Sequence, residues 1–323
     1  LSQYLLNTHW DNSIASKIMA YHSRQVLLLR SEQEHHLEEV LKRKEKTGET
    51  PQAFNNPIIR QHLNHTSAQN VIFILVATPV EEVGRDHDFD WAVIEPSSYR
   101  SIIQLAGRVR RHRKEAISSP NIAIMQYNLK ALRKDNKPSY CRPGFENEKS
   151  LRLNNHNLKT LLDETALQHA INAIPRIQEP APLRYQEQLA DLEHKAISNS
   201  IKNYNAKGAQ SLQAWLSEYW WMTALPQQFN CFRASSPDIQ LFLVWQNDKA
   251  VFGEKDEKGH FVPREGIYRI KHEVINDVIK DRLWLTRDYY NSLCRLIENE
   301  ESNTLYTEQN LRYKSLRYGE ITI

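Results

Sequence analysis

The sequence has few of the features that mark secreted, metal-binding or membrane proteins. Its 323 residues include three cysteines, Cys141, Cys231 and Cys294, which lie far apart. Because this spacing suits neither a metal site nor a set of disulfide bonds, we expect a reducing, cytoplasmic environment. No signal peptide is apparent, and no apolar run approaches the ~18 residues that a membrane helix needs. We therefore expect no membrane partner.

Motifs that hold the phosphates of ATP are also absent from the sequence. There is no Gly-x-x-x-x-Gly-Lys-Ser/Thr loop. No strand ends in Asp-Glu-x-His or a related sequence, since Asp163-Glu164 falls in a predicted helix and Asp256-Glu257 in a polar loop. The sequence also begins at Leu1, within what reads as folded sequence. We therefore expect the C-terminal part of a larger protein, which does not hydrolyse ATP by itself.

The composition is that of an ordinary globular protein with nearly balanced charge. Hydrophobic residues make up 40% of the chain, charged residues 25%, and the formal net charge is +3. So small a charge does not indicate a nucleic-acid partner. Locally, however, six Lys or Arg residues fall between Arg100 and Lys114. Such a cluster is commonly a solvated face, but this one overlaps a motif described below.

Apolar runs and their boundaries predict an α/β domain over residues 1–130. Val71–Ala77 is a continuous apolar run, which is typical of a buried parallel strand. Shorter strands are predicted at Trp91–Glu95, which Pro96 ends, and at Ile122–Gln126. Strands that alternate with helices predict a doubly wound parallel sheet, with ligands bound at the carboxyl ends of its strands.

Three helices are predicted in the same domain. Residues 1–20 form the first, with Ile14 and Ile18 on one face. The second runs from Ser31 to about Lys46, with Ser31 as its N-cap and a glutamate three residues later completing a capping box. The third covers about residues 100–110 and is capped by Ser97 or Ser98.

The remainder of the chain divides into two parts. Residues 131–204 are predicted to be a linker with helices, and residues 205–323 a small α+β accessory domain rich in aromatic residues. The predicted elements are helices at Leu151–Ala173, Arg184–Ile201 and 273–297 and strands at Leu241–Trp245 and Gly266–Ile270, with turns at Asp248–Gly253 and Asp256–Gly259. Aromatic residues such as Trp215 could stack on bases, but a domain core is the more common use of such a cluster.

The first chemical motif follows the strand at Val71–Ala77 and reads Thr78-Pro-Val-x-Glu-x-Gly84-x-Asp86. At a strand end, the Thr78 hydroxyl and the following amides can reach a phosphate oxygen of a nucleic-acid strand. Gly84 lets the backbone turn without a Cβ clash. Asp86 can hold an arginine or accept a hydrogen bond from a ribose hydroxyl. The alternative interpretation is a simple turn between a strand and a helix.

The second motif, Gln104-x-x-Gly107-Arg108-x-x-Arg111, begins eighteen residues after Asp86. Phosphoryl transfer needs cations beside the γ-phosphate in the transition state, and arginine stays charged and binds phosphate as a fork. Two arginines three apart at a helix start would lie on one face. Gly107 permits close approach to a nucleotide, which Gln104 would also contact. Arg110 lies next to Arg111 and is an alternative candidate for the second arginine of the motif.

Two further short segments contain side chains that could bind nucleic acid or a metal ion. Tyr21-His22-Ser23-Arg24 precedes a predicted helix and could place Ser23 or Arg24 on a nucleic-acid backbone, although a structural role is equally open. His87-Asp88 matches the core pair of metal-dependent HD phosphohydrolases. That site needs further His and Asp residues, and none are arranged suitably, so we interpret the pair as structural and predict no metal site in this chain.

The two motifs resemble motifs V and VI of superfamily 2 helicases, which lie on the second RecA-like motor lobe. With Tyr21-His22-Ser23-Arg24 as a match to motif IV, the run Gly-Arg-Asp-x-Asp-Phe-Asp-Trp-Ala-Val-Ile-Glu-Pro-Ser-Ser starting at Gly84 resembles the CRISPR-associated helicase–nucleases of type I systems, and in particular subtype I-F. Leu105 departs from the pattern, because the motif VI glutamine is often followed by arginine. The resemblance is specific over about residues 21–113.

The resemblance implies an ATP-dependent single-stranded-DNA translocase fused to an HD-type nuclease that degrades foreign DNA in antiviral defence. This chain would supply a RecA-like lobe, a helical linker and a C-terminal domain that covers the DNA path. Arg108 and Arg111 would be catalytic, ATP and Mg²⁺ would be bound mainly by a first lobe, and a divalent metal would serve the nuclease domain. The implied partners are single-stranded DNA and the RNA-guided surveillance complex Cascade, and further partners to consider are CRISPR integration proteins and a phage anti-CRISPR inhibitor.

Two alternatives remain open at this stage. One is another superfamily 2 helicase of DNA or RNA, such as the motor subunit of a restriction system, although the sequence Phe89-Asp-Trp and Glu95-Pro-Ser-Ser argues against it. The other is a non-catalytic module that binds DNA or a protein through a basic patch. The upstream sequence would separate the readings, since only the helicase–nuclease needs a phosphate loop and the HD-type residues.

Overall fold

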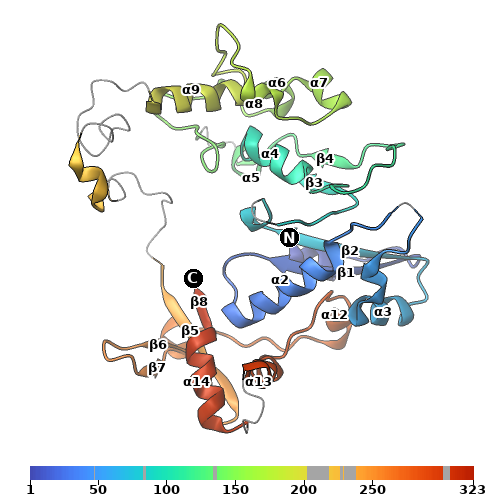
Figure 1. The fold of residues 1–323 in the computed structure, drawn as a ribbon, viewed down its shortest axis with the longest axis vertical. Coiled ribbons are helices and arrows are strands. Elements are labelled where there is room, and N and C mark those ends of the chain that lie inside the picture. The colour runs from blue at the N-terminus through green and yellow to red at the C-terminus, as the bar shows by residue number, and fades with distance from the viewer. Residues whose placement is uncertain are drawn as a thin grey trace. The chain divides into compact units, whose positions relative to one another are not determined.

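The computed structural model describes residues 1–46, 48–82, 85–133, 137–201, 218–225, 228, 238–300 and 306–323. Internal contacts divide the chain into two compact units (Figure 1). The first unit combines Leu1–His87 with Ser236–Ile323, and the second is Asp88–Ser235. Within the described ranges, none of the helices has the length and hydrophobicity needed to cross a membrane.

A parallel pair of strands forms the centre of the first unit. Strand β1 (Ile14–Tyr21) pairs with β2 (Asn70–Ala77) from Ile14–Asn70 to Tyr21–Ala77. The predicted parallel strand at Val71–Ala77 is therefore confirmed, although its side chains are half-buried or exposed and not fully buried as expected. The predicted helix over residues 1–20 is wrong, because only α1 (Ser2–Asn7) is helical there. Ile14 and Ile18 are four residues apart, a spacing that fits one face of a strand as well as one face of a helix.

A segment from near the C-terminus pairs with the other edge of β1. Leu283 forms a parallel bridge with Ile18. The Ile18 amide donates to the Arg282 carbonyl at 2.8 Å, and the Trp284 amide donates to the Ile18 carbonyl at 3.0 Å. Residues more than 260 positions apart thus share one sheet, which local sequence patterns do not reveal.

Trp284 anchors this segment in the first unit. It is 3% exposed, and its ring lies 5.1 Å from that of Phe73 and 6.0 Å, edge to face, from that of His36. His62 Nε2 donates a hydrogen bond to the Trp284 carbonyl at 2.8 Å. These partners come from β2, α2 (Leu27–Leu41) and α3 (Pro57–Asn64), so one indole joins three elements.

The two histidines predict a pH dependence of stability. Burial lowers the pKa of His36 to about 4, the charge of Glu39 opposes this, and His62 and His35 add to it. Burial also lowers the pKa of His62. Below pH 6.5 the unfolded chain binds protons on these histidines that the folded chain excludes. The contribution of the neutral histidines to the free energy of unfolding is therefore fully present above the unfolded pKa of 6.5 and is lost as pH falls toward 4.

We expect the free energy of unfolding to drop by up to about 3 kcal/mol between pH 7 and pH 4.5, measured by denaturant titration. The His36→Phe variant keeps an aromatic ring without the titrating group, so its stability should change less over this range. An identical pH profile for the wild type and the variant would contradict the assignment.

In the first unit, the residue at which a helix begins is determined by apolar packing in one case and by a side-chain cap in another. Helix α2 begins after Val26 without a side-chain cap, so the predicted cap at Ser31 is wrong. The three leucines Leu27-Leu28-Leu29 extend the helix toward its N-terminus, and Leu28 is buried there. In α3, by contrast, the Asn56 side chain accepts hydrogen bonds from the amides of Ile58 and Ile59.

An antiparallel sheet of order β7-β6-β5-β8 belongs to the same unit. Its strands are β5 (Gln240–Gln246), β6 (Lys249–Lys255), β7 (Phe261–Pro263) and β8 (Glu320–Thr322). The predicted strand at Leu241–Trp245 is confirmed. The hairpin turns at Asn247 and Asp248, both at positive φ, as a two-residue type I′ loop requires. The predicted strand at Gly266–Ile270 is wrong, since α11 (Glu265–Tyr268) lies there.

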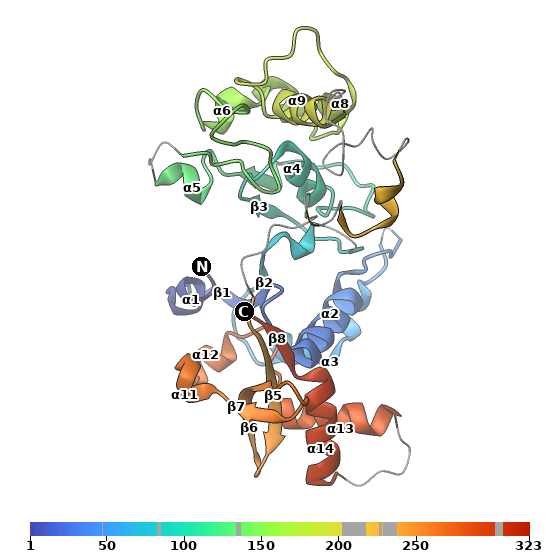
Figure 2. The ribbon, with the colours of Figure 1, turned by 90° about the vertical axis from the view of Figure 1, so that its left-hand side faces the viewer.

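Helix α13 (Tyr289–Glu300) packs against α2 and α14 (Glu308–Tyr318), and α14 packs against β5 (Figure 2). The predicted helix over 273–297 is thus split, with α12 (Asp277–Asp281) separated from α13 by the segment that holds Trp284. The shared core consists of Val26, Leu28, Leu243, Tyr289, Leu293, Ile297 and Leu311. The C-terminal residues therefore complete the core around α2.

The second unit contains another parallel pair, β3 (Ala92–Ile94) and β4 (Ile122–Ile124). Both predicted strands are confirmed. The helix between them, α4 (Tyr99–Ala106), begins at a capping box in which the Ser98 side chain accepts from the Ser101 amide, as predicted for Ser97 or Ser98. It ends at Ala106, short of the predicted residue 110.

Residues from the predicted linker supply most of this unit's core. Ile94, Tyr99 and Ile102 pack against Tyr140, Leu151, Leu153, Leu158, Leu161, Leu189 and Leu192. The helices after β4 are α5 (Leu129–Leu132), α6 (Leu158–Leu161), α7 (Glu164–His169), α8 (Ile174–Ile177) and α9 (Leu189–Ile201). A continuous helix at Leu151–Ala173 is therefore wrong, and the asparagines at 154, 155 and 157 account for the late start, because Asn157 caps α6.

The fold is α/β, as predicted, with two separate parallel pairs and one antiparallel sheet. The expected division into a motor lobe (1–130), a linker (131–204) and an accessory domain (205–323) stays a prediction. Predicted features at Gly84, Trp215 and Cys231 lie outside the described residues.

Candidate nucleic-acid and nucleotide sites

The carboxyl edge of β1 and β2 brings three predicted DNA-binding residues together. Both strands end there, with Tyr21 paired to Ala77, and the Thr78 amide donates to the Tyr21 carbonyl at 3.0 Å. Ser23 and Arg24 follow β1 after His22, and these two side chains and that of Thr78 are all exposed. All three residues therefore follow the same end of the strand pair and are open to solvent.

Tyr21 links this edge to the residues of motif V. Its ring is 1% exposed, and its hydroxyl donates to Glu34 Oε1 at 2.8 Å. Arg85 lies over the ring at 5.8 Å, donates to the Tyr21 hydroxyl at 2.7 Å and forms ion pairs with Glu34 at 2.7 Å and Glu38 at 3.2 Å. Burial raises the pKa of Tyr21 to about 12, so the hydroxyl stays a donor at neutral pH. The sequence did not single out Arg85, whose acidic partners lie on α2.

Asp86 forms an ion pair with Lys44 at 2.7 Å, and both side chains are about half exposed. We expected an arginine or a ribose hydroxyl as its partner. Since exposed pairs contribute about 0–1 kcal/mol, a ligand can compete with Lys44 for this carboxylate.

His87 and Asp88 make internal contacts that agree with the predicted structural role. His87 Nδ1 lies 2.7 Å from Glu81 Oε1, with both side chains buried. In the described part of the chain, no group of three or more His, Cys, Asp or Glu side chains is arranged to hold a metal ion.

The arginines of motif VI lie in a loop after α4, which corrects their predicted place at a helix start. The Arg108 amide donates to the Leu105 carbonyl at 3.0 Å as the helix ends. The loop then pairs with Phe89, whose amide donates to the Arg108 carbonyl at 2.8 Å and whose carbonyl accepts from the Arg110 amide at 2.9 Å. Arg110 adopts a left-handed conformation, φ 52°, which a non-glycine residue rarely does. Backbone pairing therefore fixes the path of the arginine loop.

Asp88 binds the far end of this loop. Its carboxylate is fully buried and accepts from Arg113 Nη2 at 2.7 Å, Arg113 Nε at 3.2 Å and the His112 amide at 3.0 Å. Burial by itself would lower the pKa of Arg113, but its hydrogen bonds with Asp88 and Asp90 raise it. Arg113 is therefore held within the second unit by Asp88, Asp90 and the Phe89 carbonyl.

The predicted nucleotide-binding side chains differ in exposure. Arg111 is exposed, whereas Arg108 is 7% exposed. Gln104 is half-buried, and its Oε1 accepts no hydrogen bond from the residues that the structure describes. Arg110 Nη2 donates to the carbonyl and the carboxylate of Glu115 at 3.1 and 3.2 Å. In this conformation Arg111 is thus the arginine best placed to meet a ligand.

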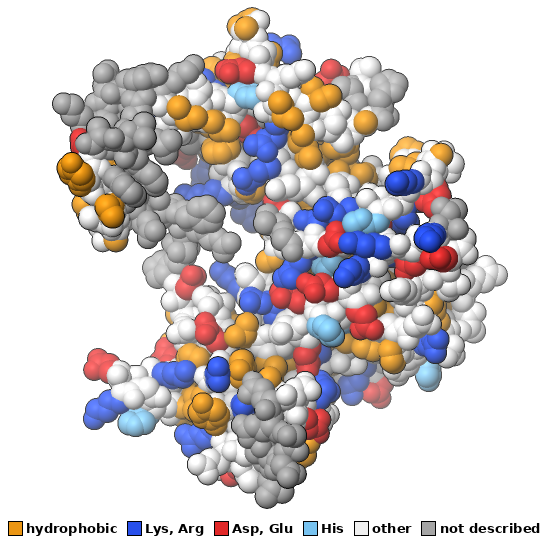
Figure 3. Space-filling model, viewed as in Figure 1, with side chains coloured by type: hydrophobic (Ala, Val, Ile, Leu, Met, Phe, Trp, Pro, Cys, Tyr) orange, Lys and Arg blue, Asp and Glu red, His pale blue; other side chains and the backbone are white. Residues whose placement is uncertain are grey.

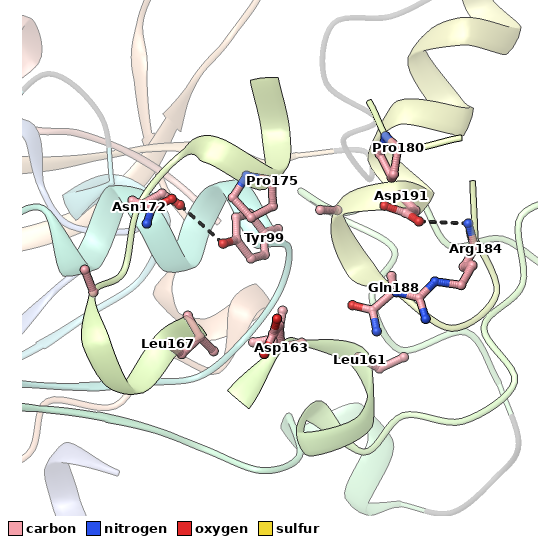
Figure 4. A pocket seen from close by; sticks show the side chains of 13 residues that line it. Tyr99, Leu161, Asp163, Leu167, Asn172, Pro175, Pro180, Arg184, Gln188 and Asp191 are labelled. Atoms are coloured by element: carbon pink, nitrogen blue, oxygen red, sulfur yellow. Dashed lines mark hydrogen bonds between the residues drawn. The ribbon is translucent and has the colours of Figure 1, made fainter. Parts of the chain in front are cut away.

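A small pocket in the second unit lies among residues that carry no predicted function (Figure 4). Tyr99 donates to the Asn172 carbonyl across it, and the Arg184 amide donates to Asp191. Its volume is about 110 Å³. Because ligand pockets commonly reach ~300 Å³ or more, this one is too small for a nucleotide.

A family model described as CRISPR-associated nuclease/helicase Cas3, C-terminal, matches residues 2–114, which include motifs IV to VI. A Cas3 of subtype I-F/YPEST from Pseudomonas aeruginosa is 33% identical over 334 residues, covering all of this chain and 29% of the relative. The chain belongs to the Cas3 family. A Cas3 of the same subtype from Pectobacterium atrosepticum is 35% identical over 250 residues, covering 73% of this chain and 22% of that relative.

The chain thus spans less than a third of the length of the curated Cas3 relatives it matches, and it corresponds to their C-terminal part. The resemblance inferred from the motifs is confirmed, including the subtype.

Proposed function

We propose that the full-length protein is an ATP-dependent single-stranded-DNA translocase joined to a metal-dependent HD-type nuclease, acting in type I CRISPR defence in the cytoplasm. The relatives carry the names nuclease and helicase, and this chain aligns with one of them along its whole length. In this proposal residues 1–130 correspond to a second RecA-like lobe.

The observation that best supports this role is the shared position of Ser23, Arg24 and Thr78 at one strand edge. Ligands of open α/β folds bind at the carboxyl ends of the strands. A guanidinium with two hydroxyls and the adjacent backbone amides suits phosphodiester oxygens, which carry no base identity. The site is therefore suited to follow a strand without reading its sequence.

ATP would meet this chain at the motif VI loop. Arg111 and Arg108 would supply positive charge to the γ-phosphate, while Gln104 and Gly107 would border the nucleotide. When bound, ATP supplies the phosphoryl group, and Mg²⁺ neutralises its charge, mainly through residues of a preceding lobe.

ATP hydrolysis by the full-length protein, with and without single-stranded DNA, tests the proposal. Stimulation by DNA supports a translocating motor. Single-strand binding without any hydrolysis would favour the alternative of a non-catalytic binding module. Partners such as Cascade would be tested separately, by recruitment of the protein to a preformed R-loop.

Thr78→Ala should weaken the coupling between DNA and ATP hydrolysis. The substitution removes one hydroxyl contact, worth about 1 kcal/mol, at an exposed position. We expect the DNA concentration for half-maximal ATPase stimulation to rise about fivefold, while the rate at saturating DNA changes little. Thr78→Ser, which keeps the hydroxyl, is the control. Equal values for Thr78→Ala and the wild type would argue against contact with DNA.

A further inference from the structure

The segment after Leu283 runs beside β1 in the same direction. Leu283 and Ile18 form a parallel bridge, so both segments head toward the carboxyl edge. Arg287 follows Leu283 by four residues, as His22 follows Ile18. Burial lowers the pKa of His22, and the charges of Arg24 and Arg287 lower it further, so both arginines act on this histidine. The C-terminal segment thus carries a cation to the edge where the predicted DNA-binding residues lie.

The guanidinium of Arg287 is partly buried and has spare donors. Its Nη1 donates to the Leu29 carbonyl at 2.7 Å. Among the described residues no carboxylate forms an ion pair with it. Glu32, whose charge acts on Arg287, is bound instead by Ser292 Oγ at 2.8 Å and Arg295 Nη2 at 2.7 Å. Since a desolvated cation without a close counter-ion is unfavourable, an anionic ligand at this position would stabilise it.

The acidic residue that follows this cation in the sequence is also engaged. Asp288 accepts from the Asn291 amide at 2.8 Å at the start of α13. On the face shown in Figure 3, Lys and Arg side chains are interspersed with Asp and Glu. The feature that favours an anion is therefore this local pair of arginines, Arg24 and Arg287, and not a broad basic surface.

We propose that Arg287, together with Arg24, binds a backbone phosphate of single-stranded DNA at the carboxyl edge of β1 and β2. The proposal rests on the proposed function and extends it to the C-terminal region. Arg287 Nη1 is held by a backbone carbonyl, so the remaining donors of the planar guanidinium are fixed in direction. Arginines from two distant parts of the chain then contact one strand.

The test compares Arg287→Gln with the wild type in the full-length protein. Affinity for a fluorescently labelled oligodeoxythymidylate is measured by anisotropy over a range of salt concentrations. Loss of one phosphate contact should weaken binding about tenfold at low salt. It should also reduce the slope of log affinity against log salt by about 0.7. Arg287→Lys, which keeps the charge, should retain most of the slope.

Arg295→Gln is the matched control, because Arg295 lies on α13, the helix that follows Arg287, but forms an ion pair with Glu32. Its salt slope should equal that of the wild type. An unchanged slope in Arg287→Gln overturns the inference, even if affinity falls, since a purely structural role would lower affinity without removing a phosphate contact. A wild-type protein that does not bind the oligonucleotide would overturn the proposed function itself.

Discussion

Replacing Arg108 and Arg111 with alanine is expected to reduce DNA-stimulated ATP hydrolysis by ~10³–10⁵-fold in the full-length protein, the range in which an arginine finger contributes to phosphoryl transfer. The side chains act on charge that develops at the γ-phosphate. Single-strand binding should remain, because the carboxyl edge of β1 and β2 is untouched. Normal turnover in the double variant would remove these arginines from the nucleotide site.

The single variants should differ in a way that reflects burial. Arg111 is exposed, so Arg111→Ala should lose activity with little change in thermal stability. Arg108 is 7% exposed, so Arg108→Ala should lose both activity and stability. Arg110→Ala serves as a control on the same loop, since Arg110 binds Glu115. An equally large loss of turnover in Arg110→Ala would show that loop geometry matters more than the two chosen charges.

Asp88→Ala is expected to destabilise the second unit by about 3–5 kcal/mol, because it leaves Arg113 without its buried counter-ion. The carboxylate also accepts the His112 amide, so its loss frees the end of the arginine loop. ATP turnover should therefore fall as well, although Asp88 does not touch the nucleotide in our proposal. Denaturant unfolding and ATPase rates measure the two effects.

Asp90→Ala is the matched control for this experiment. Asp90 pairs with the same arginine at 2.6 Å, but its side chain is 57% exposed, whereas that of Asp88 is fully buried. An exposed pair should contribute less than about 1 kcal/mol. If both substitutions had equal effects on unfolding, burial would not be the source of the stability.

Local sequence patterns predicted the features that depend on neighbouring residues. The apolar run Val71–Ala77 predicted the strand β2, although its side chains are half-buried and Ala77 is exposed. Ser98 begins α4 because its side chain satisfies an amide three residues away. The position of Thr78 follows from the end of its strand. In each case the decisive interaction lies within a few residues, so the sequence reveals it.

The motifs also identified the family, since spacing between functional residues is a property of the sequence itself. How these residues pack is a property of the folded chain and not of the sequence alone. The C-terminal third of the helix expected at residues 1–20 is a strand, because Ile18 pairs with Leu283 on one side and with Ile74 on the other. No local pattern distinguishes the two outcomes when the apolar residues are few.

The sequence by itself determined the family, and it predicted which residues carry the chemistry, namely the motif arginines and the residues at the strand ends, an assignment that stays a prediction. Tertiary structure decided which charges are available to a ligand. Arg113 and Arg287 look alike in the sequence, yet Asp88 neutralises the first, whereas the second has only a backbone carbonyl as its partner among the described residues. The reason is that a buried charge depends on groups brought to it from distant parts of the chain, and only the folded chain sets those distances.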